Sequence, residues 1–215
     1  MVTIPKQMLS VPPLENGDRL SRHEFERRYQ AMPQVKKAEL IEGVAYMASP
    51  LRIKSHGEPH GNIIGWLWTY KTAKPGVVLG DNPTVRLDPD NEPQPDAVLF
   101  IPGRQATISA DDYIEGAPEL VAEVAASTVS IDLHDKKRAY RRSGVQEYIV
   151  WRTLDQQLDW FVLKDDEYVL LNADERGIIR SRVFPGLWLA VSALLKGDMK
   201  TVLSVLQTGL QSSEG

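Results

Sequence analysis

The chain contains no cysteine among its 215 residues. This absence excludes disulfide bonds, zinc sites built from thiolates and a cysteine nucleophile. A cysteine-free chain is compatible with a reducing compartment, so we expect a cytoplasmic protein.

Long apolar runs and an excess of basic residues are also absent. No run approaches the ~18 residues of a membrane span, and residues 1–20 lack the apolar core of a signal peptide, so we expect no membrane association. The formal net charge is −4, whereas a typical tight nucleic-acid binder has a basic excess. This balance argues against nucleic-acid binding over the whole surface but allows a local basic patch.

Three common catalytic and cofactor motifs are missing as well. The sequence has no GxxxxGK[ST] phosphate loop, no GxGxxG fingerprint and no GxSxG elbow. P-loop nucleotide hydrolysis, Rossmann cofactor chemistry and α/β-hydrolase chemistry are therefore disfavoured.

The composition is that of an ordinary globular protein, with 42% apolar and 25% charged residues. Residues 1–18 are rich in proline and polar residues, which indicates an extended N-terminal lead-in. We find no convincing linker in the rest, so residues 19–215 are expected to form a single domain.

Hydrophobic periodicity predicts a mixed α/β fold. Ser21 and Glu24 match a capping box for a helix to about Ala31, and a hairpin turning near Glu42–Gly43 follows. We expect the further helices and strands from the segments 62–74, 77–80, 84–87, 96–101, 120–125, 130–142, 147–151, 157–163, 167–171, 191–195 and 199–210.

The order of these segments indicates how the sheet is built. A strand at 120–125, a helix capped by Ser130 and ended by Gly144, and a strand at 147–151 predict a parallel crossover. The remaining strands predict one sheet of mainly antiparallel strands, and residues 103–119 are expected to form a polar loop.

Two carboxylates lie in unusual places. Asp96 begins the apolar strand "AVLFI", and Glu123 lies inside the apolar run "LVAEVA". A carboxylate in such a run either faces water on an edge strand or has a partner, because an unpaired buried charge is costly. If the two strands are neighbours, both carboxylates converge and suit Mg²⁺ or Mn²⁺.

The segment after Glu123 adds a candidate cation. "DLHDKKRAYRR" places Asp132, Lys136 and Tyr140 at i, i+4 and i+8, along one stripe of a helix. A lysine on that stripe could reach an attacking water or the developing charge on a phosphate. The alternative is a solvated helix face with an Asp–Lys pair.

Taken together, several fragments carry a family resemblance. In order, "ELIEGVAYMASP", "QPDAVLF", "GAPELVAEVAAST", "DLHDKKRAYRRSGVQEYIVW" and "VFPGLWL" resemble the Uma-two family of bacterial proteins assigned as endonucleases, within the PD-(D/E)XK superfamily. The resemblance runs from about Ser21 to Leu189. It implies a restriction-endonuclease-like core, a central mixed sheet flanked by helices, and Mg²⁺-dependent cleavage of phosphodiester bonds.

The resemblance also implies roles for particular residues. Asp96 and Glu123 match the two metal-binding carboxylates of the superfamily, and Glu39 matches an acidic position of the family's N-terminal hairpin. His56 corresponds to a histidine at the start of the next helix. The residues that match the family's motif after the second carboxylate are Asp132, Lys136 and Tyr140.

The sequence departs from the superfamily at the lysine. That lysine normally lies two positions after the second carboxylate, where this chain has Ala125, so Lys136 on the following helix becomes the catalytic candidate. Ala126 replaces a common proline, and Arg152 stands where many relatives have an aspartate, so we assign neither position a role.

His56 and His60 are four residues apart and could bind zinc. Pro59 is expected to disturb the helix that would align them, and no further histidine lies nearby, so a zinc site is disfavoured. The tryptophans at 66, 68, 160 and 188 are expected in the core or an interface rather than under nucleic-acid bases.

Three functions remain open from the sequence. The first is a metal-dependent endonuclease acting on nucleic acid, with DNA the expected substrate and a homodimer the expected assembly. The second is an inactive nuclease-fold protein that binds nucleic acid or a protein partner, which the net charge and Ala125 favour. The third is a dimer with a purely structural role.

Overall fold

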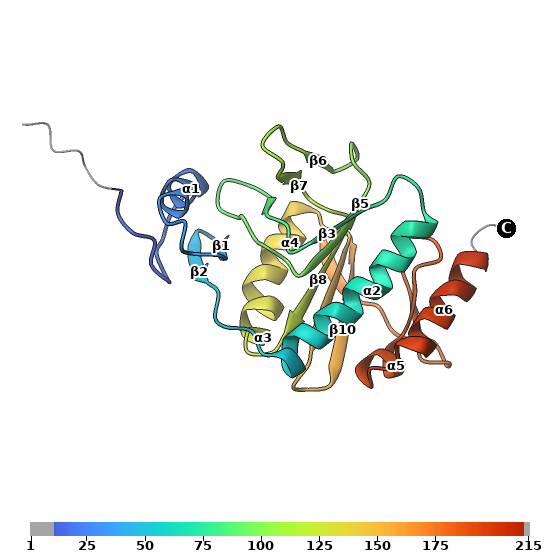
Figure 1. The fold of residues 1–215 in the computed structure, drawn as a ribbon. Helices are drawn as coiled ribbons and strands as arrows, with labels where there is room; N and C mark the ends of the chain where they lie inside the picture. Colours follow the sequence, from blue (N-terminus) through green and yellow to red (C-terminus); the bar gives the residue numbers. More distant parts are fainter. Residues whose placement is uncertain (1–10, 213–215) are drawn as a thin grey trace, which may run out of the picture.

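The computed structural model describes residues 11–212 (Figure 1). The helical segments are α1 (Arg22–Gln30), η1 (Ile53–Gly57), α2 (Glu58–Ala73), α3 (Val129–Ile131), η2 (Asp132–Lys136), α4 (Lys137–Ser143), α5 (Val191–Leu195) and α6 (Met199–Ser212), where η denotes a π-helical turn. The strands are β1 (Ala38–Ile41), β2 (Val44–Met47), β3 (Val78–Asp81), β4 (Val85–Arg86), β5 (Ala97–Phe100), β6 (Ala106–Ile108), β7 (Ile114–Gly116), β8 (Leu120–Ala125), β9 (Glu147–Arg152), β10 (Gln157–Lys164), β11 (Glu167–Leu170), β12 (Ile178–Arg180) and β13 (Trp188–Ala190).

A six-stranded mixed sheet forms the centre, in the order β11-β10-β9-β8-β5-β3. β8 and β9 are parallel, and the helical segment from α3 to α4 connects them, so the predicted parallel crossover is confirmed. The other neighbours in this sheet pair antiparallel. The predicted mixed α/β fold is therefore confirmed.

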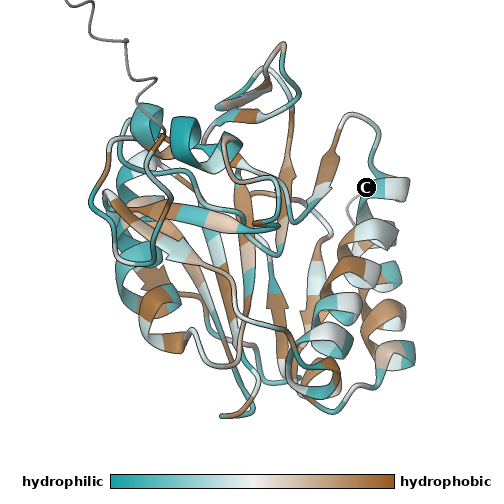
Figure 2. Ribbon diagram, turned by 60° about the vertical axis from the view of Figure 1, so that its left-hand side comes forward, coloured by the Kyte–Doolittle hydropathy of each residue, from teal (hydrophilic) through white to brown (hydrophobic). Residues whose placement is uncertain are grey.

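Helices cover both faces of this sheet (Figure 1). On one face, α2 and α6 pack over a core that contains Trp66, Leu99, Trp160 and Leu206. On the other face, Tyr140 of α4 joins a second core with strand residues of β5, β8 and β9. Hydrophobic residues run along the central strands in Figure 2, as expected for a sheet that is shielded from water on both sides.

The N-terminal part forms a small module beside the sheet. α1 packs against the β1–β2 hairpin through Phe25, Leu40 and Ala45. The hairpin turns at Glu42 and Gly43, both with positive φ, which suits a tight two-residue connection and confirms the predicted turn. A bridge between Leu40 and Glu92 attaches the hairpin to the segment before β5.

The prediction of one sheet is wrong. β4, β7 and β6 form a separate three-stranded sheet, and β12 and β13 form a two-stranded one. The expected polar loop 103–119 contains β6 and β7, which are only three residues each and are separated by turns. Such short strands leave no readable alternation in the sequence.

Two predicted helix caps are also wrong. Ser21 is the residue before α1 but makes no side-chain cap, and the Glu24 carboxylate accepts hydrogen bonds from Arg27 and Arg28. The crossover helix begins at Val129 rather than after Ser130. Gly144 does end α4 in the left-handed conformation, with φ of 87°, as predicted.

The described part of the N-terminal lead-in is anchored to the module. Leu14 is buried with Phe25 and Leu40, while residues 1–10 of the lead-in lie outside the described residues. Within residues 11–212, no helix combines the length and hydrophobicity needed to cross a bilayer.

Candidate active site

Glu123 lies in the middle of β8, whose six residues are all buried. β8 pairs with β5 on one side and β9 on the other, so it is an internal strand. Glu123 is 4% exposed. The interpretation of a wet edge strand is therefore wrong, and the carboxylate has partners.

The main partner of Glu123 is Lys136. Its Nζ lies 3.0 Å from Oε1 of Glu123 and 2.8 Å from Oε1 of Glu39, and it is 3.7 Å from Oδ1 of Asp132. Lys136 is itself 5% exposed. One buried ammonium group thus joins the central strand, the N-terminal hairpin and the crossover helix.

The crossover helix holds this lysine in place through a π-helical turn. Asp132 and Lys136 are the first and last residues of η2, and such turns are frequent at functional sites. Oδ2 of Asp132 accepts a hydrogen bond from Thr128 Oγ1 at 2.6 Å. One turn further on, the Tyr140 hydroxyl donates to Oε1 of Glu123 at 2.8 Å. The predicted stripe of Asp132, Lys136 and Tyr140 thus faces Glu123.

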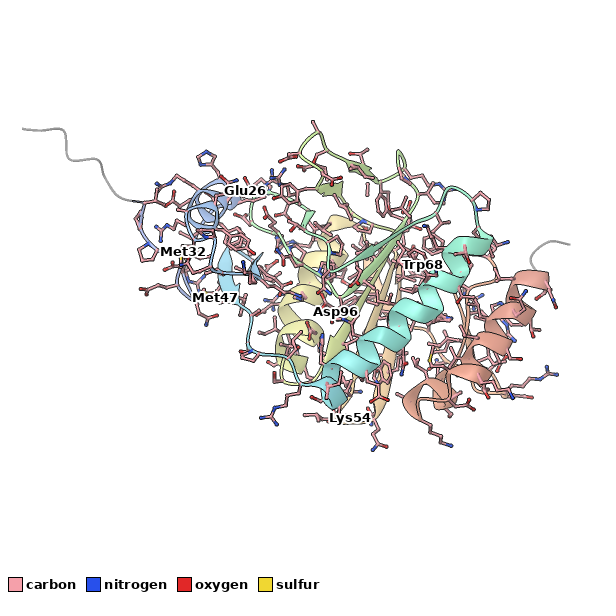
Figure 3. All side chains as sticks on the ribbon, viewed as in Figure 1. Glu26, Met32, Met47, Lys54, Trp68 and Asp96 are labelled. Atoms are coloured by element: carbon pink, nitrogen blue, oxygen red, sulfur yellow. The ribbon has the colours of Figure 1, made fainter. Side chains whose placement is uncertain are left out.

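Asp96 comes directly before β5 and faces the same part of β8. Ala97 pairs with Ala122, and continuing this register by one residue places Asp96 opposite Glu123. Oδ2 of Asp96 accepts a hydrogen bond from the Val124 amide at 2.7 Å. Figure 3 labels Asp96 near the centre of the view, beside the central strands. The structure therefore brings the two predicted carboxylates together.

Glu39 approaches from the β1–β2 hairpin. Its Oε1 accepts the Gln94 amide hydrogen at 2.7 Å, which fixes the carboxylate beside Lys136. The family's acidic hairpin position is thus part of the same cluster as Glu123.

His56 lies on the other side of Asp96, in η1. Its Nδ1 is 2.9 Å from the Val124 carbonyl oxygen, and its Nε2 is 3.3 Å from Oδ1 of Asp96. This second contact is an ion-pair distance without hydrogen-bond geometry, since Nε2 of His56 is buried without a hydrogen-bond partner.

His60 is a neighbour that the sequence reasoning set aside. Pro59 lies in the first turn of α2, directly after the π-helical turn η1, and it does not separate the two histidines as predicted. The helix begins at η1, before the predicted start at 62, and keeps the His56 and His60 rings 5.6 Å apart. Their four-residue spacing was the signal that could have found this pair.

The cluster carries more negative than positive charge. Burial, together with the charges of the neighbouring carboxylates, outweighs the opposing effect of Lys136 and raises the pKa of Glu123 to about 8. Burial also raises the pKa of Asp132. For Lys136, burial opposes the charged form, but Glu123, Glu39 and Asp132 outweigh it and raise the pKa well above its ordinary value. The Lys136 side chain therefore stays protonated and positively charged at neutral pH.

The pKa values of Asp96 and His56 are shifted towards the charged forms of both groups, whereas those of Glu123 and Asp132 are shifted towards the neutral forms. Burial raises the pKa of Asp96, but His56 and the Val124 amide outweigh burial and lower it overall. The pKa of His56 is raised, chiefly by Asp96. Each group thus stabilises the charged form of the other.

The carboxylates fit a divalent cation. Asp96 and Glu123 are hard oxygen donors on neighbouring strands, and Oε1 of Glu123 is already engaged by Lys136 and Tyr140, so the other oxygen is the one suited to a metal. The raised pKa of Glu123 indicates surplus negative charge that a cation would neutralise.

The residue at the usual lysine position cannot contribute. Ala125 is fully buried in the core formed by β8, β9 and α4. Lys136 instead reaches Glu123 from the helix that covers this face of the sheet.

Comparison with known proteins identifies the family and the fold. The family model Uma2, described as "Putative restriction endonuclease", matches residues 22–192. A crystal structure described as a putative nuclease belonging to DUF820, from Anabaena variabilis, is similar with a TM-score of 0.61 and 14% sequence identity, over 80% of this chain and 97% of that chain. Among curated proteins, none matches the sequence. At this identity the structural likeness concerns the fold.

Proposed function

The chain belongs to the Uma2 family, and on that premise we propose that it is a metal-dependent endonuclease that hydrolyses phosphodiester bonds in DNA. Asp96 and Glu123 are the proposed ligands of Mg²⁺, with Mn²⁺ as a substitute, and Lys136 is the proposed catalytic cation. The observation that carries the proposal is the contact between Lys136 and Glu123 on adjacent elements, despite Ala125 at the usual lysine position.

A divalent cation bound there would supply a water of lowered pKa and positive charge beside the phosphate. Lys136 adds a positive charge that is already held in place before the phosphate binds. Because its pKa is raised well above the ordinary value, Lys136 stabilises charge or orients a water rather than removing a proton.

The remaining residues position Lys136. Glu39 holds Nζ from the hairpin at 2.8 Å, and Asp132 holds it from the preceding helical turn at 3.7 Å. Tyr140 orients Glu123 by donating to the same oxygen that Lys136 contacts. These residues are positioning residues in the proposed mechanism.

The experiment is a cleavage assay on plasmid and single-stranded DNA with Mg²⁺ or Mn²⁺. We expect Asp96→Asn and Glu123→Gln each to lower the rate by about 1000-fold, since each removes a charged ligand. Asp165→Asn is the matched control, because Asp165 is an exposed turn residue whose positive φ asparagine tolerates. Equal cleavage by Asp96→Asn and wild type would indicate a contaminant and overturn the proposal.

The alternative is a protein of this fold that binds DNA without cutting it, which the loss of the usual lysine at Ala125 favours. The same preparations distinguish the two functions. Retained DNA binding with no cleavage at any Mg²⁺ or Mn²⁺ concentration would support the alternative.

A further inference from the structure

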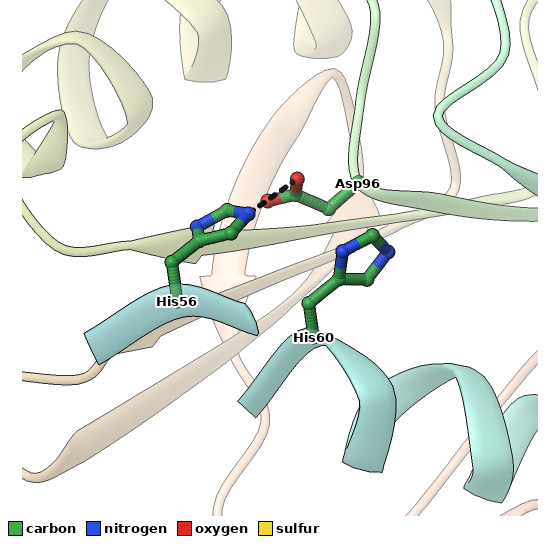
Figure 4. A group of neighbouring side chains, drawn as sticks. All are labelled: His56, His60 and Asp96. Carbon is green, nitrogen blue, oxygen red and sulfur yellow. Dashed lines mark ion pairs between the residues drawn. The ribbon is translucent and has the colours of Figure 1, made fainter. Parts of the chain in front are cut away.

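His56, His60 and Asp96 form a compact group on the α2 side of Asp96 (Figure 4). Each offers one ligand atom, and these atoms all lie within 4.8 Å of one another. His56 and Asp96 are buried, and His60 is half-buried. The three residues come from η1, the first turn of α2 and the residue before β5, so the tertiary fold is needed to assemble them.

The hydrogen bonds on the outer side of each imidazole fix which nitrogen carries the proton. The Val124 carbonyl can only accept, so Nδ1 of His56 is the donor at 2.9 Å. Nε2 of His60 lies 3.0 Å from the Asp81 carboxylate, which can only accept, and 3.5 Å from Nδ2 of Asn82, so the shorter contact makes Nε2 the donor. In a neutral ring the other nitrogen then bears a lone pair. Such outer-sphere contacts are typical of metal-binding histidines.

The inner nitrogens are directed to Asp96. Nε2 of His56 is buried without a hydrogen-bond partner and lies 3.3 Å from Oδ1 of Asp96. Figure 4 shows the second ring nitrogen of His60, the one not engaged by Asp81, on the side of the ring towards Asp96. Lone pairs that face one another across a buried gap require a proton or a metal ion between them.

The spacing suits a metal ion. With ligand bonds of about 2.0 Å at a tetrahedral angle, two ligand atoms are about 3.3 Å apart. The 3.3 Å between His56 Nε2 and Asp96 Oδ1 matches this value, and the ligand atom of His60 lies within 4.8 Å of both. Imidazole ligands select transition metals over Mg²⁺, which prefers an all-oxygen site.

We propose that His56, His60 and Asp96 bind a divalent transition-metal ion of the zinc class. Three protein ligands leave a fourth position open to water, the arrangement of reactive rather than purely structural zinc sites. Asp96 is shared with the proposed magnesium ligands, but both histidines lie outside that carboxylate pair. The site exists independently of nuclease activity, so its test measures metal binding alone.

The test is a calorimetric titration of Zn²⁺ into chelator-treated full-length protein without a histidine tag. We expect one ion per chain, not displaced by millimolar Mg²⁺. His60→Gln is the main variant, because His60 is half-buried and its loss leaves the core packing intact. We expect it to weaken binding about 100-fold or more, and Asp81→Asn to weaken binding about 10-fold through the lost outer contact.

Two further histidines provide matched controls. His23 and His134 are exposed, and His23→Gln and His134→Gln should leave Zn²⁺ binding unchanged. Co²⁺ in place of Zn²⁺ should give the visible absorption of a four-coordinate site in wild type, and this absorption should be lost in His60→Gln.

The variant Glu123→Gln distinguishes the proposed zinc site from the proposed nuclease activity. It should abolish cleavage and retain Zn²⁺ binding, and Zn²⁺ binding without any cleavage by wild type would refute only the nuclease. The proposed site would be overturned if wild type bound no stoichiometric Zn²⁺, or if His60→Gln bound it as tightly as wild type. Either result would indicate that a proton lies between His56 and Asp96. Loss of Zn²⁺ binding in Glu123→Gln would also overturn it, because the ion would then lie at the carboxylate pair.

Discussion

Nζ of Lys136 lies 3.0 Å from Oε1 of Glu123, between a helix and an internal strand that are both removed from water. A buried ion pair of this kind contributes little net stability against an apolar replacement of both partners. Removing one partner is different, because the remaining charges stay buried without compensation. The pair therefore couples the stability of the fold to the integrity of the proposed site.

We predict that Lys136→Met lowers the free energy of unfolding by about 3–5 kcal/mol at about pH 9, where Glu123 is ionised. The methionine fills most of the volume, but Glu39, Glu123 and Asp132 lose their shared cation. Urea denaturation followed by circular dichroism measures this loss. Lys137→Met is the neighbouring control, since Lys137 stacks on the Phe161 ring at 3.6 Å and its loss should cost about 1 kcal/mol. Equal losses in the two variants would contradict the pairing.

Tyr140→Phe tests the second contact to Glu123. The change removes one hydroxyl, so the carboxylate loses a hydrogen bond of 2.8 Å but keeps Lys136. Hydrogen bonds to charged groups are worth about 1.5–3 kcal/mol, and we expect a destabilisation in that range by the same urea measurement.

Tyr46→Phe provides the comparison for that measurement. The Tyr46 hydroxyl donates to Asp135 at 3.3 Å in a partly exposed place, so its loss should cost less than about 1 kcal/mol. A Tyr140→Phe variant as stable as Tyr46→Phe would show that Lys136 alone satisfies Glu123.

Much of the central sheet could be predicted from the sequence, because its strands are short apolar runs with clear turn residues between them. The run "LVAEVA" identified β8, and Gly144 identified the end of α4. The helical spacing of Asp132, Lys136 and Tyr140 identified residues that do meet Glu123. Local rules suffice where burial and periodicity agree.

The sequence alone could not predict features that depend on tertiary contacts. The pairing of His56 and His60 with Asp96 depends on where the start of α2 lies relative to β5. The π-helical turn that carries Lys136 has no recognised sequence pattern, so its exact position required the structure.

A third prediction concerns pH and the N-terminal module. Glu92 is 5% exposed, and burial together with Glu26 raises its pKa to about 8. The folded state therefore holds a proton that the unfolded chain releases near the ordinary value of 4.5. It follows that the contribution of Glu92 to stability is full below pH 4.5, declines as the pH rises, and is lost above about pH 8.

The variant Glu92→Gln should remove this dependence. We expect the difference in unfolding free energy between Glu92→Gln and wild type to shift in favour of the variant from pH 5 to pH 8, by at most about 1.4 kcal/mol per pH unit. Glu24→Gln is the control, because the pKa of Glu24 is lowered to about 2 and it does not titrate in this range. A constant difference between Glu92→Gln and wild type would refute the raised pKa.

The last prediction uses two helical glycines that differ in their surroundings. A Cβ at Gly209 in α6 would lie 2.5 Å from the Gly186 carbonyl oxygen and 2.6 Å from Cγ of Trp188. Gly65 in α2 has nothing within 4 Å of the corresponding position. Alanine is the better helix former by about 1 kcal/mol, so Gly65→Ala should raise the free energy of unfolding by about that amount.

Gly209→Ala gains the same propensity but forces α6 away from the segment before β13. Overpacking of this kind costs about 1–3 kcal/mol, and the close atom is backbone, which cannot rotate away, so we expect net destabilisation. Parallel urea denaturation of the two variants gives the sign directly. If both substitutions stabilise the protein, then α6 does not pack on Gly186 and Trp188 as closely as described. The packing of the core beneath α2 and α6 would then differ from the one given above.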